Sequence, residues 1–372
     1  YFNPEVISGI PFSGNLVGLG GFTNGEITRA GGSTPKLYRQ RLFVRQTWNH
    51  GGEQELLESD FNQMAGWVDK NRFVLTAGNF STLDVFDDNA YAKDPRTQFM
   101  NWGNWTYAAY DYAADARGYG WGFAGEWYQD NWVLRFGRMT GPKEPNGLPV
   151  DFAIGKHYGD QVEIERAHIL ADQPGKVRLL AWHNRAQVAS FSDATLWVTQ
   201  WQQAHPNDVQ VGPDALIAVR GGEKNKYGLG VNVEQAISPS VGFFLRAMKT
   251  DGKTETYAFT EADNSLSTGL VFKGGLWGRA DDAVGVAFMR NTLSPERRGF
   301  LAVGGMSFFI GDAASPTQTL NYQPEQILEA FYSFQMTRGT WLTTDYQRIQ
   351  NPAYNADRGP VNVYALRFHA EF

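Results

Sequence analysis

The clearest indication of the fold is the last stretch of the chain, Val361-Asn-Val-Tyr-Ala-Leu-Arg-Phe-His-Ala-Glu-Phe372. Its residues alternate strictly between two kinds. One set is apolar: Tyr364, Leu366, Phe368, Ala370 and Phe372. The other set is Ala365, Arg367, His369 and Glu371. Because alternate residues of a β-strand point to opposite faces, the stretch predicts a strand with one apolar face and one small or polar face.

The same alternation recurs along the chain and predicts an all-β protein with about fourteen readable strands. Clear examples are Tyr119–Trp127, Tyr227–Glu234, Leu266–Lys273, Leu328–Phe334 and Leu342–Gln347. One face of these segments is rich in large aromatic residues, whereas the other is rich in Gly, Ser, Asn, Glu and Arg. Small and charged groups cannot fill a dry core. The pattern therefore predicts a transmembrane, antiparallel, up-and-down barrel with an apolar outside and a water-filled inside.

The predicted connections alternate between short and long. The short ones are Asp69–Asn71, Gln129–Asn131, Ala171–Gly175, Ser238–Ser240, Trp277–Asp281 and Thr337–Gly339. The long ones are Ser81–Arg117, Thr140–Tyr158, Ala186–Asn225, Thr250–Asn264, Asn291–Leu320 and Asn351–Gly359. Outer-membrane barrels have short periplasmic turns and long extracellular loops, so this order favours that class. A last strand that ends on Phe372 also resembles the C-terminal signal that the barrel assembly machinery recognises.

Composition excludes several other classes. The 372 residues include 12 Trp, 16 Tyr, 25 Phe and 41 Gly, carry a net charge of −6 and contain no Cys. The acidic balance argues against a nucleic-acid partner, and the lack of Cys removes thiol catalysis, disulfides and Cys-based zinc sites. No apolar run is long enough for a membrane-spanning helix, and the six His lack metal-site spacing. We find no linker, and expect one domain over residues 1–372 with no cofactor and no metal.

Four stretches resemble the carbohydrate-selective porin family of Gram-negative outer membranes: Leu83–Trp102, Asp111–Tyr119, Leu320–Ile327 and Leu366–Phe372. The resemblance extends over essentially the whole chain. It implies an outer-membrane porin that passes monosaccharides or small oligosaccharides by passive diffusion, either as a monomer or as a homotrimer. It also implies sixteen strands, so that two further strands are expected before Tyr1.

Charged residues on the predicted inner face are candidates for lining the pore. The strand Leu37–Trp48 places Arg39, Arg41 and Arg45 on one face by alternation, and an arginine row facing lipid is costly. These arginines could donate to sugar hydroxyls, or they could pair with carboxylates across the lumen and hold its shape. The carboxylates and the further arginine predicted to line the lumen are Glu126, Glu163, Glu165 and Arg246.

The loop 81–117 is the candidate constriction, because long barrel loops often fold inward. It mixes aromatic rings, carboxylates and amides, which suits polyhydroxylated solutes. Its candidate solute-contacting residues are Asp87, Asp88, Asn89, Asp94, Arg96 and Trp102. The alternative is a solvated outer loop whose aromatic residues pack on the rim.

Two other functions stay open at this point. A secreted, Trp-rich β-protein could act on polysaccharide with Glu163 and Glu165 as acid and base, since residues two apart on a strand lie roughly 6–7 Å apart. A general porin for polar solutes, or an exporter of a charged polymer, is the alternative within the barrel class. Mixed charges on the inner face disfavour a track for a polyanion.

Overall fold

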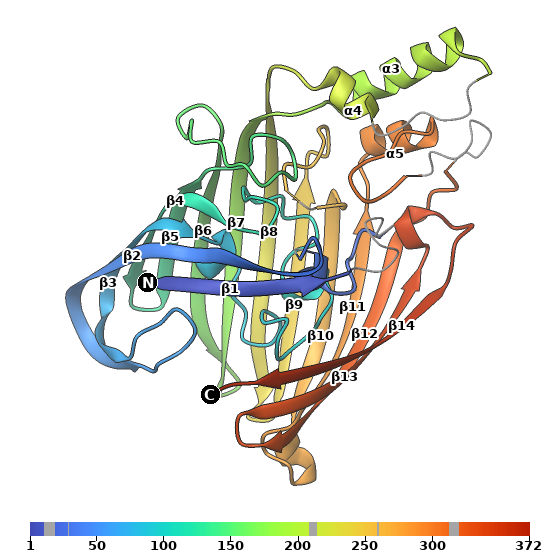
Figure 1. The fold of residues 1–372 in the computed structure, drawn as a ribbon. Coiled ribbons are helices and arrows are strands. Elements are labelled where there is room, and N and C mark those ends of the chain that lie inside the picture. The colour runs from blue at the N-terminus through green and yellow to red at the C-terminus, as the bar shows by residue number, and fades with distance from the viewer. Residues whose placement is uncertain (11–18, 29, 208–213, 259, 312–319) are drawn as a thin grey trace.

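The computed structural model describes residues 1–10, 19–28, 30–207, 214–258, 260–311 and 320–372. Fourteen strands form one antiparallel sheet in which every strand pairs with its neighbours in sequence (Figure 1). The number agrees with the alternation read from the sequence. The strands are β1 Phe2–Gly9, β2 Gly32–Leu57, β3 Gly66–Phe80, β4 Gly120–Gln129, β5 Trp132–Met139, β6 Tyr158–Leu170, β7 Gln173–Gln187, β8 Glu223–Ser238, β9 Val241–Thr250, β10 Asn264–Lys273, β11 Ala283–Thr292, β12 Glu325–Thr337, β13 Thr340–Gln350 and β14 Val361–Ala370.

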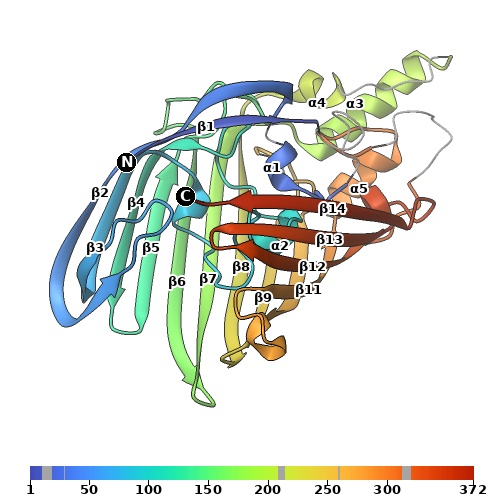
Figure 2. The same ribbon diagram turned by 60° about the horizontal axis from the view of Figure 1, so that its bottom comes forward.

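The sheet curves round until its two edge strands, β1 and β14, come to the same side (Figure 2). Within the described ranges, β1 pairs with β2 alone and β14 with β13 alone. These ranges thus contain fourteen strands, against the sixteen that the family resemblance implied.

Helices and 3-10 turns lie in the long connections, and one 3-10 turn lies in a short connection. They are α1 Gly25–Thr28, α2 Trp102–Trp105, α3 Phe191–Ala204, α4 Asp214–Val219 and α5 Pro295–Ala302, with 3-10 turns η1 Thr82–Asp84, η2 Gly274–Trp277 and η3 Pro352–Tyr354. The 3-10 turn in a short connection is η2, between β10 and β11. Across the described ranges, no helix combines the length and the apolar character needed to cross a membrane. Residues 208–213 and 312–319 of two predicted long loops lie outside the described residues.

Connections alternate in length, as predicted. Two-residue turns join β4 to β5, β6 to β7, β8 to β9 and β12 to β13, whereas residues 81–119 join β3 to β4 and residues 188–222 join β7 to β8. Short turns lie at one end of the strands and long loops at the other. In an outer-membrane barrel the long-loop end is extracellular.

One predicted turn, Asp69–Asn71, is wrong. These residues lie inside β3, and residues 58–65 make the connection from β2. The polar cluster serves a bulge in β2 instead, because the Asp69 carboxylate accepts from the backbone N–H of Gly51 at 2.7 Å and the register shifts on both sides of Gly51. Gly51 has a φ of 105°, which favours glycine. Turn-forming residues here mark an irregularity within a hairpin.

The outward face of the sheet is apolar and exposed. Along β5, Trp132, Leu134 and Phe136 are exposed, whereas Val133 and Arg135 between them are buried. The same alternation holds in β6, where Val162 and Ile164 are exposed and the intervening glutamates are buried. The structure therefore has the apolar-out arrangement that a barrel in lipid requires.

Candidate functional site

The connection from β3 to β4, residues 81–119 and here termed the β3–β4 loop, lies against the inner face of the sheet. Helix α2 belongs to it and appears on the concave side of the sheet in Figure 2. Its side chains and backbone bond to inward-facing residues of nine strands: Arg41 of β2, Glu163 of β6, Asn184 of β7, Asn232 and Glu234 of β8, Arg246 of β9, Ser265 of β10, Glu329 of β12, Gln347 of β13 and Arg367 of β14.

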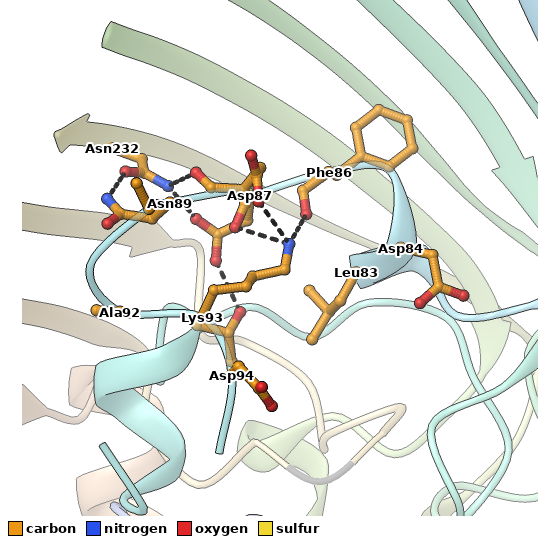
Figure 3. A network of polar contacts seen from close by, with 12 residues as sticks. Leu83, Asp84, Phe86, Asp87, Asn89, Ala92, Lys93, Asp94 and Asn232 are labelled. Carbon is orange, nitrogen blue, oxygen red and sulfur yellow. Dashed lines mark hydrogen bonds and ion pairs between the residues drawn. The ribbon is translucent and has the colours of Figure 1, made fainter. Parts of the chain in front are cut away.

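Asp87 is the centre of the first group of these contacts (Figure 3). One of its carboxylate oxygens accepts from Nε of Arg246 at 2.8 Å and from Nδ2 of Asn232 at 2.6 Å, and the other accepts from Oγ1 of Thr106 at 2.9 Å. Its backbone N–H donates to Glu163 at 2.9 Å. Asp87 is fully buried and has a φ of 56°, so the loop turns sharply where it is most firmly held.

The second group of contacts fixes the far side of the loop. The Glu329 carboxylate accepts from the backbone N–H groups of Met100 and Asn101 and from the side-chain amide of Asn104. Arg367 donates to the carbonyls of Pro95 and Gln98 at 2.6 and 2.9 Å. Carboxylates that bond several N–H groups and guanidinium groups that bond carbonyls are strong anchors where water is excluded.

Charged residues of alternating sign run across the wall beneath the loop. Arg135 of β5 contacts Glu126 of β4 at 3.2 Å and Glu163 and Glu165 of β6 at 2.9 and 3.0 Å. Arg178 of β7 contacts Glu165 at 2.7 Å and Glu234 of β8 at 3.0 Å. These side chains are buried, and each of the four carboxylates lies beside one of the two arginines, which offsets the cost of burying its charge.

A cavity of about 700 Å³ lies between this loop, the turn 58–65 and strands β1, β2, β4 and β5. Cationic, anionic and aromatic side chains all line it. The charged residues among them are Glu5, Glu26, Arg41, Arg45, Asp60, Asp84, Asp88, Lys93, Asp94, Arg96, Arg117, Glu126 and Arg135, and the aromatic residues are Phe22, Phe61, Trp102, Trp105, Tyr112, Tyr119 and Tyr128.

Aromatic rings lie against several of the cavity's cations. The guanidinium of Arg41 lies 4.7 Å from the ring centre of Phe61, and that of Arg96 lies 4.4 Å from the same ring. The guanidinium of Arg41 also lies 5.1 Å from the ring centre of Tyr119. Phe61 thus joins two arginines from different segments, one from the wall and one from the β3–β4 loop.

Asp88 and Asp94 are the carboxylates that the loop presents to the cavity. Burial opposes ionisation of Asp88, but Lys93 and Arg178 outweigh it and hold the pKa of the carboxyl well below its usual range. Each of these cations lies 3.7 Å from the carboxylate. Burial likewise opposes ionisation of Asp94, and Arg96 at 2.8 Å lowers its pKa. Both groups are therefore anionic at neutral pH.

The structure divides the predicted site residues into two sets. Those that line the cavity are Arg41, Arg45, Asp88, Asp94, Arg96, Trp102 and Glu126. Those that do not line it are Arg39, Asp87, Asn89, Glu163, Glu165 and Arg246. Apart from Arg39, the second set is buried and hydrogen-bonded behind or within the β3–β4 loop.

The prediction that Arg39 shares a face with Arg41 and Arg45 is wrong. In the pairing of β1 with β2, Asn3 lies opposite Arg41 and Pro4 opposite Arg39, so one residue of β2 is unmatched. This bulge turns Arg39 to the outward face, where its guanidinium lies 5.2 Å from the ring centre of Trp121. A single unmatched residue exchanges the faces of a strand.

The predicted partners of the arginines also differ. Arg41 binds Asp84 through two contacts of 2.7 Å, and Arg45 donates to Thr76 and to the carbonyl of Asn62. The glutamates are held instead by Arg135 and Arg178, which our sequence analysis missed. The alternation could have identified both arginines, because each occupies the same alternate positions as the buried residues of its strand.

Comparisons with known proteins bear on the fold and on the family of this chain. The model of the family described as "Carbohydrate-selective porin, OprB family" matches residues 1–372. A comparison with curated protein sequences gives no significant match. Among solved structures, Pseudomonas putida OprB at high pH is 16% identical with a TM-score of 0.66, covering 95% of this chain and 77% of that one. The outer-membrane channel DcaP of Acinetobacter baumannii is 8% identical with a TM-score of 0.44, covering 98% and 91%.

The likeness to the Pseudomonas putida protein supports the fold, and the family match covers the whole described barrel and its loops. A porin of the outer membrane has no catalytic role for Glu163 and Glu165, in keeping with their burial against Arg135. This chain belongs to the OprB family of carbohydrate-selective porins of the Gram-negative outer membrane.

Proposed function

We propose that monosaccharides and small oligosaccharides diffuse passively through the cavity between the β3–β4 loop and the wall formed by β1, β2, β4 and β5. The main support for this proposal is the cavity itself. Its volume of about 700 Å³ is within the roughly 300–1,000 Å³ typical of small-molecule sites, and its lining combines charges of both signs with aromatic rings. Sugars offer hydroxyl groups to the charges and C–H faces to the rings.

The predicted residues then have two different tasks. Asp87, Asn89, Glu163 and Arg246 are buried, and we propose that they hold the loop in place and set the width of the opening. Arg45, Asp88 and Arg96 line the cavity and are at least partly exposed, so we propose that they contact the solute.

The mixed lining favours neutral polar solutes over a charged polymer. Arg41 lies beside Asp84, and Lys93 lies beside Asp88, so a linear polyanion would meet a carboxylate at both of these cations. A track for a polyanion needs one sign of charge repeated. A porin without sugar preference is the remaining alternative.

Planar-bilayer conductance of the refolded protein tests the proposal, with a panel of neutral sugars added to look for current block. We expect stepwise channels that monosaccharides block in a saturable manner, because the solute must occupy the charged and aromatic lining. Channels that no sugar blocks at any concentration would overturn selective passage and favour a general pore. Liposome swelling with sugars of increasing size then measures the largest solute admitted.

Assembly is a further part of the proposal. The outward residues Tyr364, Leu366 and Phe368 of β14 are exposed, and Phe372 is exposed beyond them. We propose that this strand and Phe372 are recognised by the barrel assembly machinery. Cross-linking of detergent-solubilised protein separates the two assembly states proposed, a monomer and a homotrimer.

A further inference from the structure

The outward face of β9 to β14 is apolar except at its extracellular end. Alternate residues such as Leu266, Phe288 and Leu328 are exposed in its central band. In these six strands, all of which the structure describes, the outward positions carry three charged residues, and all are basic: Lys249 of β9, Arg290 of β11 and Arg348 of β13.

The three cations lie at one level of the sheet. The pairing row that starts at Lys249 passes through Asn264 to Thr292, two residues beyond Arg290. The row that starts at Arg290 passes through Gln326 to Gln350, again two residues beyond Arg348. Each step of two strands therefore moves the cation by two residues toward the short-turn end.

This two-residue shift is expected because the strands are tilted, so that residues at one height do not fall on one pairing row. At the short-turn end, the row from Val241 through Phe272 and Val284 reaches Tyr332, five positions before Thr337, the last residue of β12. Residues that lie at one height in the membrane must therefore shift toward the short turns, relative to the pairing row, from β9 to β13. Lys249, Arg290 and Arg348 follow that step. Alternate strands are roughly 10 Å apart, so the cations are spaced along a shallow arc.

These cations differ from those at the same end of β5 to β8. There, Arg138 contacts Asp160 at 2.7 Å, and Arg185 is paired with Glu223. Within the ranges that the structure describes, Lys249, Arg290 and Arg348 have no ion pair and no side-chain hydrogen bond. Unpaired cations on a lipid-facing surface are tolerated at the interface, where head groups are available, and not at the bilayer centre.

We propose that Lys249, Arg290 and Arg348 form a docking surface for phosphorylated lipid head groups of the outer leaflet, with the acyl chains lying along the apolar band below. Charge complementarity favours an anionic lipid on this surface, because basic residues at a membrane interface attract anionic head groups. The three cations lie at the long-loop end of the strands, which places the lipid in the outer leaflet. The surface is separate from the permeation cavity, which lies on the inner side near β1 to β5.

The test uses the whole protein in detergent, titrated with diphosphorylated lipid A and followed by native mass spectrometry. We expect the wild type to retain lipid A and the triple variant K249Q/R290Q/R348Q to retain at least about tenfold less. The control R138Q/D160N removes one compensated pair at the same end of β5 and β6, and should retain lipid as the wild type does. If the triple variant does not refold, the three single variants replace it, and each should lose part of the binding.

Two further arms identify the source of the phosphate. Lipid A without phosphate groups should bind the wild type as weakly as the triple variant binds the phosphorylated lipid, and millimolar inorganic phosphate should not displace the lipid. Equal retention by the wild type and the triple variant would overturn the proposal. Strong binding of the phosphate-free lipid, or displacement by inorganic phosphate, would also overturn it. Unchanged single-channel conductance of the variants shows that the barrel is intact.

Discussion

Asp87 and Arg246 are 159 residues apart in sequence, yet a carboxylate oxygen of one accepts a 2.8 Å hydrogen bond from Nε of the other, and both side chains are buried. Removing one partner of a buried ion pair typically costs about 3–5 kcal/mol, because the other charge is left uncompensated. We expect Asp87→Ala to release the part of the β3–β4 loop around residue 87, while Glu329 and Arg367 still hold its far side and the sheet persists. Single-channel conductance should rise and block by sugars should weaken.

The control for this variant is Asp357→Ala. Asp357 is exposed and bonds Asn321 in an outer loop, away from Arg246. Its removal should leave conductance and sugar block unchanged. An Asp87→Ala channel with wild-type conductance and wild-type sugar block would show that Asp87 does not hold the constriction.

Arg45 and Arg39 belong to the same strand but face opposite sides, which makes them a matched pair. Arg45→Ala removes a half-buried cation from the cavity lining, so conductance should rise modestly and the channel should become less selective for anions. Arg39→Ala removes an exposed cation from the outside and should change neither property. Ion selectivity measured from reversal potentials in a salt gradient decides the matter; equal effects of the two variants would contradict the assigned faces.

Phe61 contacts the guanidinium groups of Arg41 and Arg96, yet its ring is exposed and lines the cavity. A ring in this position offers a flat face to a sugar, and loss of about 1 kcal/mol of such contact raises a dissociation constant roughly fivefold. We therefore expect Phe61→Ala to weaken the sugar block by about that factor. Phe152→Ala, which removes an exposed ring outside the cavity, serves as the control. Sugar titrations of single-channel current measure both, and an unaltered block in Phe61→Ala would remove the ring from the solute path.

Strand identity was predictable because alternation is a local property. In β5, every second residue is exposed, and the same phase could have found Arg135 at once. The face of Arg39 was not predictable, because the bulge at Gln40 arises in the pairing with β1, where Asn3 lies opposite Arg41 and Pro4 opposite Arg39. Alternation within one strand carries no record of an unmatched residue in its neighbour.

The partners of the β3–β4 loop were also beyond local reasoning. Composition suggested that Asp87 and Asn89 contact solute, but both are bound to Asn232, more than 140 residues away. A Gly-rich inner face predicts a wet interior. Part of it instead accepts aromatic residues of the loop, since a side chain on Gly230 would contact the ring of Tyr107. Small residues therefore marked places where two segments meet.

Asp88 is expected to affect how the ion selectivity of the channel changes at acid pH. Lys93 and Arg178 hold the pKa of its carboxyl below the ordinary value of roughly 3.9, so it stays anionic as the pH falls from 7 to about 4. Its charge is lost only as the pH falls further, through the lowered pKa. The contribution of Asp88 to ion selectivity, measured as the difference between the wild type and Asp88→Asn, should therefore be constant from pH 7 to about 4, and the wild type should approach the greater anion selectivity of the variant below that range.

Asp88→Asn should show this greater anion selectivity already at neutral pH, and its profile should be flat where that of the wild type changes. Asp357→Asn, which removes a carboxylate from an outer loop, should follow the wild type. Reversal potentials measured at each pH give both curves. A change in the wild type between pH 6 and 5 that Asp88→Asn abolishes would contradict the lowered pKa.

Gly242 of β9 lies against the ring of Tyr91 of the β3–β4 loop. A Cβ atom on Gly242 would fall on the ring of Tyr91, so the wall and the loop approach too closely for any larger residue. Gly242→Leu should displace this part of the loop and give channels of several conductance levels, whereas the sheet should persist because β9 keeps its pairing with β8 and β10. Tyr91→Ala in the same chain should restore a single level by vacating the space. Single-channel recordings of both variants test this, and a failure of Tyr91→Ala to restore uniform channels would show that the contact with Tyr91 is not the reason for glycine at this position.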